Sequence, residues 1–249
     1  MIIQSCFLHG NEDVTCSRGR GGVGIFLSKR AMKAWTNAGS CKPDLSGIVV
    51  ECPRFMGIKL LFKEPGNKPM KLYVSTTYHL HSGMHRQLTE EYYKHFDDFL
   101  DRAYAPNDYQ TIVGGDTNTP LGTPIDDDDL HILGRYHGAP LTSRNDKSTA
   151  ALKNTILKHQ LWASTTDFTH KRYDTWSGIG KWGGRHQIDH FLTSTSFPRK
   201  NILDAKRVGN GIGSDHAAIK LKLRINPAPK LYPGKGQSSL SPSPTGAQV

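Results

Sequence analysis

Five polar side chains stand where apolar runs of the sequence begin or end. Asp116 and Asn118 follow "TIVGG", Asp189 lies in "QIDHF", and Asp215 and His216 precede the last apolar stretch in "GSDH". A carboxylate can hold a divalent cation, and a histidine backed by a second carboxylate can transfer a proton or contact a charged phosphate. These groups are the parts needed to hydrolyse a phosphodiester. The alternative, in which Asp and Asn only favour turns at strand ends, stays open for each position taken alone.

Two glycines lead directly into the first of these positions. Gly114 and Gly115 separate the apolar run from Asp116. Glycine lets a backbone or a ligand approach where a side chain would block it. This order of residues therefore indicates a site at the end of a strand.

Strands and helices must bring these positions together. Short apolar runs bounded by Gly, Pro or Ser predict strands, whereas apolar residues at three- and four-residue steps predict helices. The stretch 217–225 alternates apolar with basic residues, so one face should pack on a core and the other should meet solvent. Pro53 predicts a bend or hairpin between two strands. The predicted strands are 22–27 (buried), 46–53, 56–63, 71–80, 109–116, 188–194 and 217–225, and the predicted helices are 87–103 and 148–162.

The composition bounds the class of protein. The chain has 249 residues, a formal net charge of +10 and a pI near 9.4, as expected of a protein that meets a phosphate polymer, although many basic proteins are merely soluble. No apolar run approaches the roughly 18 to 20 residues that span a bilayer, and "MIIQSCFLHGNED" does not resemble a leader segment. The charge fits a phosphate polymer or an anionic surface as the partner, and the resemblance described below narrows this expectation to DNA. We also expect no membrane association, a monomer and an intracellular location, with the nucleus as one option.

Two further features concern the ends of the chain. Four cysteines, Cys6, Cys16, Cys41 and Cys52, lack C-x-x-C spacing and are expected to be reduced thiols, with a disulfide as the alternative. Residues 226–249 are rich in Pro, Ser and Gly and predict a disordered tail behind one domain at 1–225.

Four sequence blocks, taken in order, resemble a known superfamily. "GGDTN", "YDTW", "QIDHFLTS" and "GSDHAAI" are similar to the G-D-x-N, T-W, D-x-x-x-x-S and S-D-H blocks of the endonuclease/exonuclease/phosphatase superfamily, over about residues 5–225. "GVGIFLSKRAMKAWTNAG" and "YHLHSG" look like the apurinic-type endonuclease domains of non-LTR retrotransposons. The resemblance implies an α+β fold, a four-layer α/β/β/α sandwich of two mostly antiparallel sheets. It also implies a Mg²⁺-dependent phosphodiesterase, most simply a DNA endonuclease.

The resemblance also implies roles for individual residues. Asp116 would position and activate the attacking water, and Asn118 would hydrogen-bond to the scissile phosphate or to the nucleophile. His216 would contact the phosphate, with its imidazole held by Asp189. Tyr78 would donate toward the phosphate or the leaving oxygen.

The metal assignment follows the same resemblance. Mg²⁺, or Mn²⁺ in its place, would lie at Asp116 and Asn118, with Asp215 at the metal or near its water shell. Where the family usually has Y-x-P-N, this sequence has Tyr78, His79, Leu80 and His81, so the family's asparagine contact is not expected here.

The beginning of the chain departs from the family pattern. Family members start with a strand-helix-strand unit whose second strand ends in the glutamate that is the main metal ligand. "MIIQS" would place Ser5 at that position, but the segment up to Gly22 is shorter than the family's, and Glu51 lies in a different strand. We therefore expect an N-terminally incomplete domain that lacks this unit. The alternative function is a catalytically inert remnant that binds nucleic acid without cleaving it.

Three other features have competing interpretations. The run "DDDD" at 126–129 is expected to be a solvated loop rather than a cation site. His79, His81 and His85 are expected to be exposed histidines rather than zinc ligands. The Gly-rich loop "TWSGIGKWGGRHQID" carries Trp182, Lys181 and Arg185, which, with His81, are candidates for nucleic-acid contacts. Trp176 is expected to pack in the core, with nucleic-acid contact as the alternative.

Overall fold

The structure is a computed structural model of the whole chain. It describes residues 2–4, 23–49, 52–63, 68–80, 86–104, 109–122, 124, 126–134, 147–172, 174–177, 184–209 and 215–225. The expected tail at 226–249 and the candidate residues His81, Lys181 and Trp182 lie outside this part of the chain, as do Cys6 and Cys16. Cys41 is exposed and has a free thiol.

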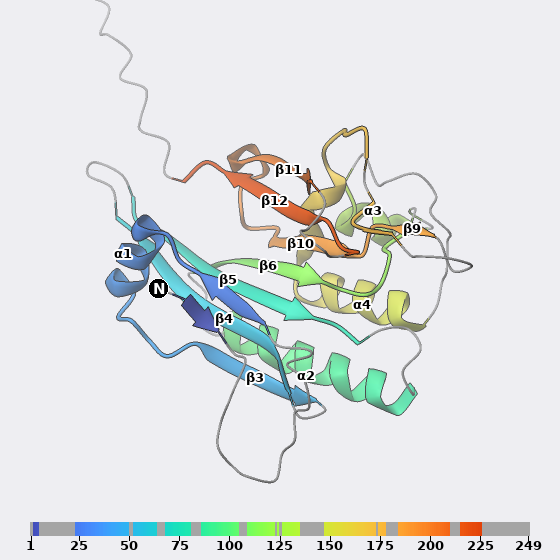
Figure 1. Cartoon of the computed structure of the whole chain (residues 1–249), viewed down its shortest axis with the longest axis horizontal. Helices are drawn as coiled ribbons and strands as arrows, with labels where there is room; N and C mark the ends of the chain where they lie inside the picture. The colour runs from blue at the N-terminus through green and yellow to red at the C-terminus, as the bar shows by residue number, and fades with distance from the viewer. Residues whose placement is uncertain are drawn as a thin grey trace, which may run out of the picture.

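A six-stranded sheet forms the centre of the described residues (Figure 1), in the order β3-β4-β5-β6-β10-β7. Neighbouring strands are antiparallel except for β5 and β6, which are parallel. A parallel pair needs a crossover connection, and a long helix between the two strands supplies it. The strands are β3 (Asp44–Val49), β4 (Cys52–Phe62), β5 (Met70–Tyr78), β6 (Gln110–Asp116), β7 (Leu161–Ala163) and β10 (Asp189–Ser194).

The crossover helix α2 (Arg86–Tyr104) packs along one face of this sheet. Its buried stripe includes Phe96 and Phe99, whose rings lie 5.2 and 5.4 Å from the ring of Phe55 on β4. The helix α4 (Lys147–Lys158) covers the same face with Leu152 and Ile156. Burial of these aromatic and aliphatic side chains fixes both helices on the sheet.

The other face of the sheet carries a second β layer (Figure 1). It consists of two antiparallel pairs, β1 (Ile2–Gln4) with β2 (Gly24–Phe26) and β11 (Ile202–Val208) with β12 (Ala218–Leu223). Leu221 and Leu223 of β12 pack inward while Lys220 and Lys222 are exposed, which confirms the predicted alternation. The α+β class with two layers of mostly antiparallel sheet is thus confirmed. The incomplete N-terminus stays a prediction.

The remaining elements are short and connect or flank these layers. Helix α1 (Lys29–Asn37) begins at the capping side chain of Ser28 and packs against β4, where Asn37 Nδ2 donates to the Leu61 carbonyl at 3.2 Å. The others are α3 (Asp127–Ile132), η1 (Ser164–Thr166), β8 (Trp176–Ser177), β9 (Arg185–His186) and η3 (Arg199–Asn201). No helix in the described part of the chain combines the length and the apolarity needed to cross a bilayer.

Most predicted elements are present, but the bend predicted at Pro53 is wrong in position. Pro53 lies inside β4 and pairs with Ile48 of β3, so the antiparallel β3–β4 pair is connected before Cys52. The predicted helix at 148–162 is wrong at its end. Gln160 adopts a left-handed backbone (φ 48°), so the helix stops and Leu161–Ala163 forms β7. The strand predicted at 22–27 is not wholly buried, because Phe26 is 74% exposed.

Two predictions about polar residues are also wrong. The "DDDD" run is exposed at its first three residues, as predicted, but it is not a loop. Asp126 caps α3 by accepting from the Asp129 backbone N–H, and the buried Asp129 carboxylate accepts from Lys153 Nζ at 2.6 Å. His79 is not exposed but fully enclosed by aromatic rings of α2. In both cases a helix distant in sequence covers the polar group.

Candidate functional site

Three candidate residues meet at one edge of the six-stranded sheet because of strand register. Tyr78 is paired with Asp116 across the parallel β5–β6 pair, and Asp116 is paired with Asp189 across the antiparallel β6–β10 pair. β5 and β6 both end there, and β10 begins there. The residues predicted from separate sequence blocks thus form one row.

The two glycines of β6 permit close packing at this edge. A Cβ on Gly115 would overlap the carbonyl oxygen of Thr77 on β5, and a Cβ on Gly114 would lie 2.6 Å from the ring of Phe191 on β10. Any larger residue would push the neighbouring strands away from β6. Gly115 therefore serves the close approach of a backbone, as predicted, whereas Gly114 makes room for a side chain, which was not predicted.

The turn after β6 is held by Asn118. Its backbone, in the left-handed region (φ 47°), directs the N–H to Asp116 Oδ1 at 2.7 Å, and its side-chain Nδ2 donates to the His79 carbonyl at 2.9 Å. Asn favours this backbone region more than most residues do. The side-chain amide of Asn118 thereby links the ends of β5 and β6. Its Nδ2 is used in the bond to His79, and its Oδ1 is not part of that bond.

His216 is brought to the edge by a different part of the chain. Its Nδ1 donates to Asp189 Oδ2 at 3.0 Å, which leaves Nε2 3.8 Å from Asp116 Oδ2. The segment 215–217 is anchored by a β-bridge between Trp176 and His216. A histidine ring held in this way presents a defined nitrogen, Nε2, toward Asp116.

Thr175 supports this arrangement and was not predicted. Its hydroxyl oxygen accepts from the backbone N–H groups of Ile188 and Asp189, both at 3.0 Å, and its carbonyl accepts from the Ala217 N–H at 2.6 Å. Thr175 therefore connects the start of β10 to the segment that carries His216. Only the "TW" block hinted at its importance, and its hydrogen bonds are not visible in sequence.

The electrostatics of the three groups are coupled. Burial, reinforced by the neighbouring Asp189 charge, raises the pKa of Asp116 to about 6. The hydrogen bond to Asp189, with the nearby carboxylates, raises the pKa of His216 above its usual value. Asp116 is therefore a stronger base than an ordinary aspartate, and His216 keeps its proton more readily than an ordinary histidine.

The same three residues could take part in holding a cation. Within the described ranges, Asp116, Asp189 and His216 form one group whose potential ligand atoms all lie within 4.8 Å of one another. Two carboxylates this close repel each other, and a divalent cation would relieve that repulsion. Since Mg²⁺ accepts one or two carboxylates together with water and substrate phosphate, the two carboxylates of this group fit a magnesium ion.

Three other predicted residues are placed as follows. Tyr78 has the Arg54 guanidinium 4.8 Å from its ring centroid, and Arg54 Nη1 donates to its carbonyl at 3.3 Å. Asp215 lies outside the three-residue group, and its Oδ2 accepts from the Trp176 indole N–H at 2.8 Å. Arg185 is exposed on β9. Trp176 is partly exposed. Arg54 had no signal in the sequence.

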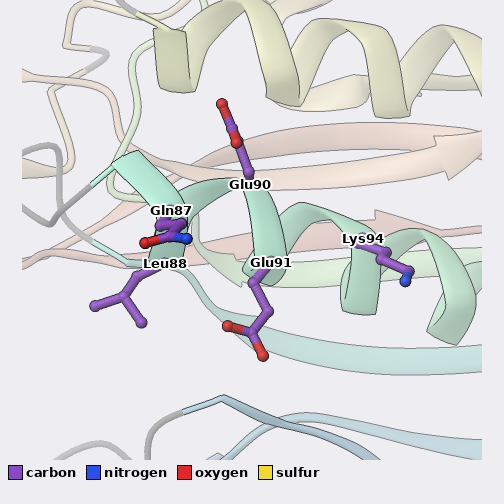
Figure 2. A pocket seen from close by; sticks show the side chains of 5 residues that line it. All are labelled: Gln87, Leu88, Glu90, Glu91 and Lys94. Carbon is purple, nitrogen blue, oxygen red and sulfur yellow. The ribbon is translucent and has the colours of Figure 1, made fainter.

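A separate depression on the outer surface of α2 does not belong to this site. Figure 2 shows Glu90 and Glu91 pointing to different sides of the helix, and Arg86 Nε already contacts Glu90 Oε1 at 2.6 Å. The two carboxylates do not converge as metal ligands would. The lining residues are Gln87, Leu88, Glu90, Glu91 and Lys94.

No protein-family model and no curated protein sequence matches the chain. Similar solved structures include the endonuclease domain of TRAS1, a telomere-specific non-LTR retrotransposon, at 12% identity and a TM-score of 0.47, with 74% of this chain and 69% of that chain covered. The Xenopus laevis APE2 catalytic domain is 20% identical, with a TM-score of 0.48 and coverage of 70% and 58%. An endonuclease/exonuclease/phosphatase family protein from Leptotrichia buccalis is 15% identical, with a TM-score of 0.45 and coverage of 71% and 56%.

This chain therefore spans little more than half the length of the last two structures. The Leptotrichia buccalis protein bears the name of the superfamily that the sequence blocks resemble.

Proposed function

We propose that this chain is a metal-dependent phosphodiesterase of the nuclease type that hydrolyses a DNA phosphodiester with water. The observation that carries the proposal is the position of His216 between two carboxylates. Its Nδ1 is bonded to Asp189, and its Nε2 faces Asp116. Water activation and charge stabilisation at a phosphate need these two functions side by side.

Each residue has a defined share in the proposed reaction. Asp116, with its pKa raised to about 6, can accept a proton from an attacking water near neutral pH. The hydrogen bond to Asp189 raises the pKa of His216, so its Nε2 can donate a proton to a phosphate oxygen. The Tyr78 phenol would donate toward the phosphate or the leaving oxygen, and the Asn118 carbonyl oxygen can orient the water.

A divalent metal ion would assist these residues in the proposed reaction. The sequence assigns it to Asp116, Asn118 and Asp215, and of these Asp116 belongs to the three-residue group within the described ranges. When bound, Mg²⁺ or Mn²⁺ would neutralise the charge that develops on the phosphate.

Two observations support DNA as the substrate: the net positive charge of the chain and the position of the β8–β9 pair beside the site. The chain carries a formal net charge of +10, and phosphate contacts supply much of the affinity for DNA. The β8–β9 pair, which carries Arg185, adjoins the site through the bridge between Trp176 and His216. In the sequence, Lys181 and Trp182 come between these two strands. We propose that these residues, with His81, contact the nucleic acid.

Plasmid nicking by the purified full chain tests the proposal. We expect nicking with Mg²⁺ or Mn²⁺, none with EDTA, and a loss of about 10²- to 10⁴-fold in His216→Ala, the usual contribution of a group that transfers a proton. Asp189→Ala should also lose activity, whereas Asp98→Ala, an exposed carboxylate on α2, should not.

The opposite outcome is equally informative. A folded sample that retains DNA in a salt-dependent way but gives no nicked product with any metal would contradict the proposed activity. It would identify the chain as a nucleic-acid-binding module without cleavage.

A further inference from the structure

The carboxylate of Asp215 is engaged with an aromatic side chain. Its Oδ2 accepts the indole N–H of Trp176 at 2.8 Å. The Trp176 ring in turn stacks on the His186 imidazole, with centroids 5.6 Å apart and planes inclined by 24°. Both rings are partly exposed, and Asp215 itself is exposed. The three residues therefore form a surface unit, Asp215–Trp176–His186.

The backbone holds this unit beside the proposed site. Trp176 is paired with His186 in the β8–β9 pair and is bridged on its other side to His216. Gly184 leaves room for the imidazole, because a Cβ there would lie 2.5 Å from His186 Nε2. The stacked rings consequently have a defined place next to the histidine that would contact the phosphate.

We propose that Asp215 is a positioning residue that acts through Trp176, and that the Trp176–His186 stack is a face on which a nucleotide base next to the scissile phosphate lies. The substrate class rests on the proposed function. Asp215 is absent from the group of three potential metal ligands in the described part of the chain, and its Oδ2 is already committed to an N–H donor. Its role differs from the metal role assigned by sequence.

The chemistry of the face fits a base. Every nucleic-acid base has a π surface that stacks on aromatic side chains regardless of its identity. An indole that is tethered by a charge-assisted hydrogen bond loses less rotational freedom when a base stacks on it. Asp215 would thus favour DNA binding even though its own charge repels a polyanion.

The proposal is testable because the charge of Asp215 alone would weaken DNA binding, whereas its bond to Trp176 would strengthen it. If Asp215 acted on DNA by charge alone, Asp215→Ala would tighten binding, because it removes a negative charge near the phosphate. If Asp215 were only a metal ligand, Asp215→Ala would leave DNA binding in EDTA unchanged or tighter. The proposed tether predicts that Asp215→Ala weakens DNA binding in EDTA.

The experiment measures fluorescence anisotropy of a labelled single-stranded DNA oligonucleotide with the full chain in EDTA. We expect about tenfold weaker binding for Asp215→Ala and for Trp176→Phe, which keeps a ring but lacks the N–H donor. The double variant should be no weaker than either single variant, because both remove the same bond. Asp215→Asn, which keeps an acceptor oxygen, should bind within about twofold of the unsubstituted chain, and Asp98→Ala controls for loss of one negative charge.

Manganese affinity, measured by electron paramagnetic resonance without DNA, completes the test. Asp215→Asn should retain the affinity within about twofold, while Asp116→Ala should lower it. Unchanged or tighter DNA binding in Asp215→Ala, or a loss of manganese affinity of about tenfold or more in Asp215→Asn, would overturn the positioning role. Failure of the proposed function shows separately, as absence of nicking by a chain whose Asp215→Ala variant still loses DNA affinity.

Discussion

Replacing His79 with leucine should make the protein more stable, and more so in acid. The imidazole is 1% exposed, and neither ring nitrogen has a hydrogen-bond partner among the residues that the structure describes. It is enclosed by the rings of Tyr92 and Phe96, each with its centroid 4.9 Å away. A buried polar group without a partner costs about 1 to 3 kcal/mol. Leucine of similar size removes that cost, while the backbone bonds of residue 79 to Asp116 and Asn118 remain.

The acid effect follows from the histidine's proton affinity. Burial, with smaller contributions from His190 and Arg54, lowers the pKa of His79 to about 3, against about 6.5 in an unfolded chain. Because the folded pKa is the lower one, the unfolded state gains the proton first, and stability falls as the pH drops from about 6.5 toward 3. At about pH 5 this loss amounts to about 2 kcal/mol, since each pH unit within the window is worth about 1.4 kcal/mol.

Urea unfolding followed by tryptophan fluorescence at about pH 7.5 and about pH 5 measures both effects. His79→Leu should gain about 1 kcal/mol or more at the higher pH and lose about 2 kcal/mol less than the unsubstituted chain on acidification. Burial also lowers the pKa of His190, to about 4, so His190 still contributes to the loss of stability in acid in both the variant and the unsubstituted chain. His131→Leu, at an exposed position of α3, is the control. An unchanged pH dependence in His79→Leu would refute the reasoning.

Three further substitutions test the fold and the site. Asp129→Ala should cost about 3 to 5 kcal/mol in urea unfolding because it leaves Lys153 unpaired in a nearly buried setting, and Asp129→Leu with Lys153→Met should recover most of that loss. Gly115→Ala should destabilise by about 1 to 3 kcal/mol, since its Cβ would overlap the β5 backbone; wild-type stability would contradict this packing. Asp189→Asn should shift the alkaline limb of the nicking profile to lower pH, because Asp189 raises the pKa of His216; an unshifted limb would mean that His216 does not act as a proton donor.

The candidate site was largely predictable because its chemistry lies at strand ends. An apolar run that passes through two glycines into Asp116 predicts both a strand and a polar group at its tip, and the same holds for Asp189 at the start of β10. The sequence does not contain the register. That Asp116 lies between Tyr78 and Asp189 depends on the parallel pairing of β5 with β6, which α2 makes geometrically available.

The failed predictions share a physical cause. His79 and Asp129 were judged by their own polarity, yet their burial is decided by helices 13 or more residues away in the chain, through Tyr92 in one case and Lys153 in the other. Gln160 was placed inside a helix because the apolar period continues past it, whereas its left-handed backbone starts β7. Local pattern describes which residues are apolar but not which distant partner covers a polar one.

The site has two halves that are held in place by different parts of the structure, so substitutions in each half should have different effects. Asp116 and Asp189 belong to neighbouring strands of the central sheet, which the helices on one face and the second β layer on the other hold in place. His216 comes from a short segment attached through Thr175 and Trp176. The bond between His216 and Asp189 joins these halves, so a change that loosens Thr175 or Trp176 should displace His216 while leaving Asp116 in position. Loss of activity with an intact fold is therefore expected from the second half, and loss of stability from the first.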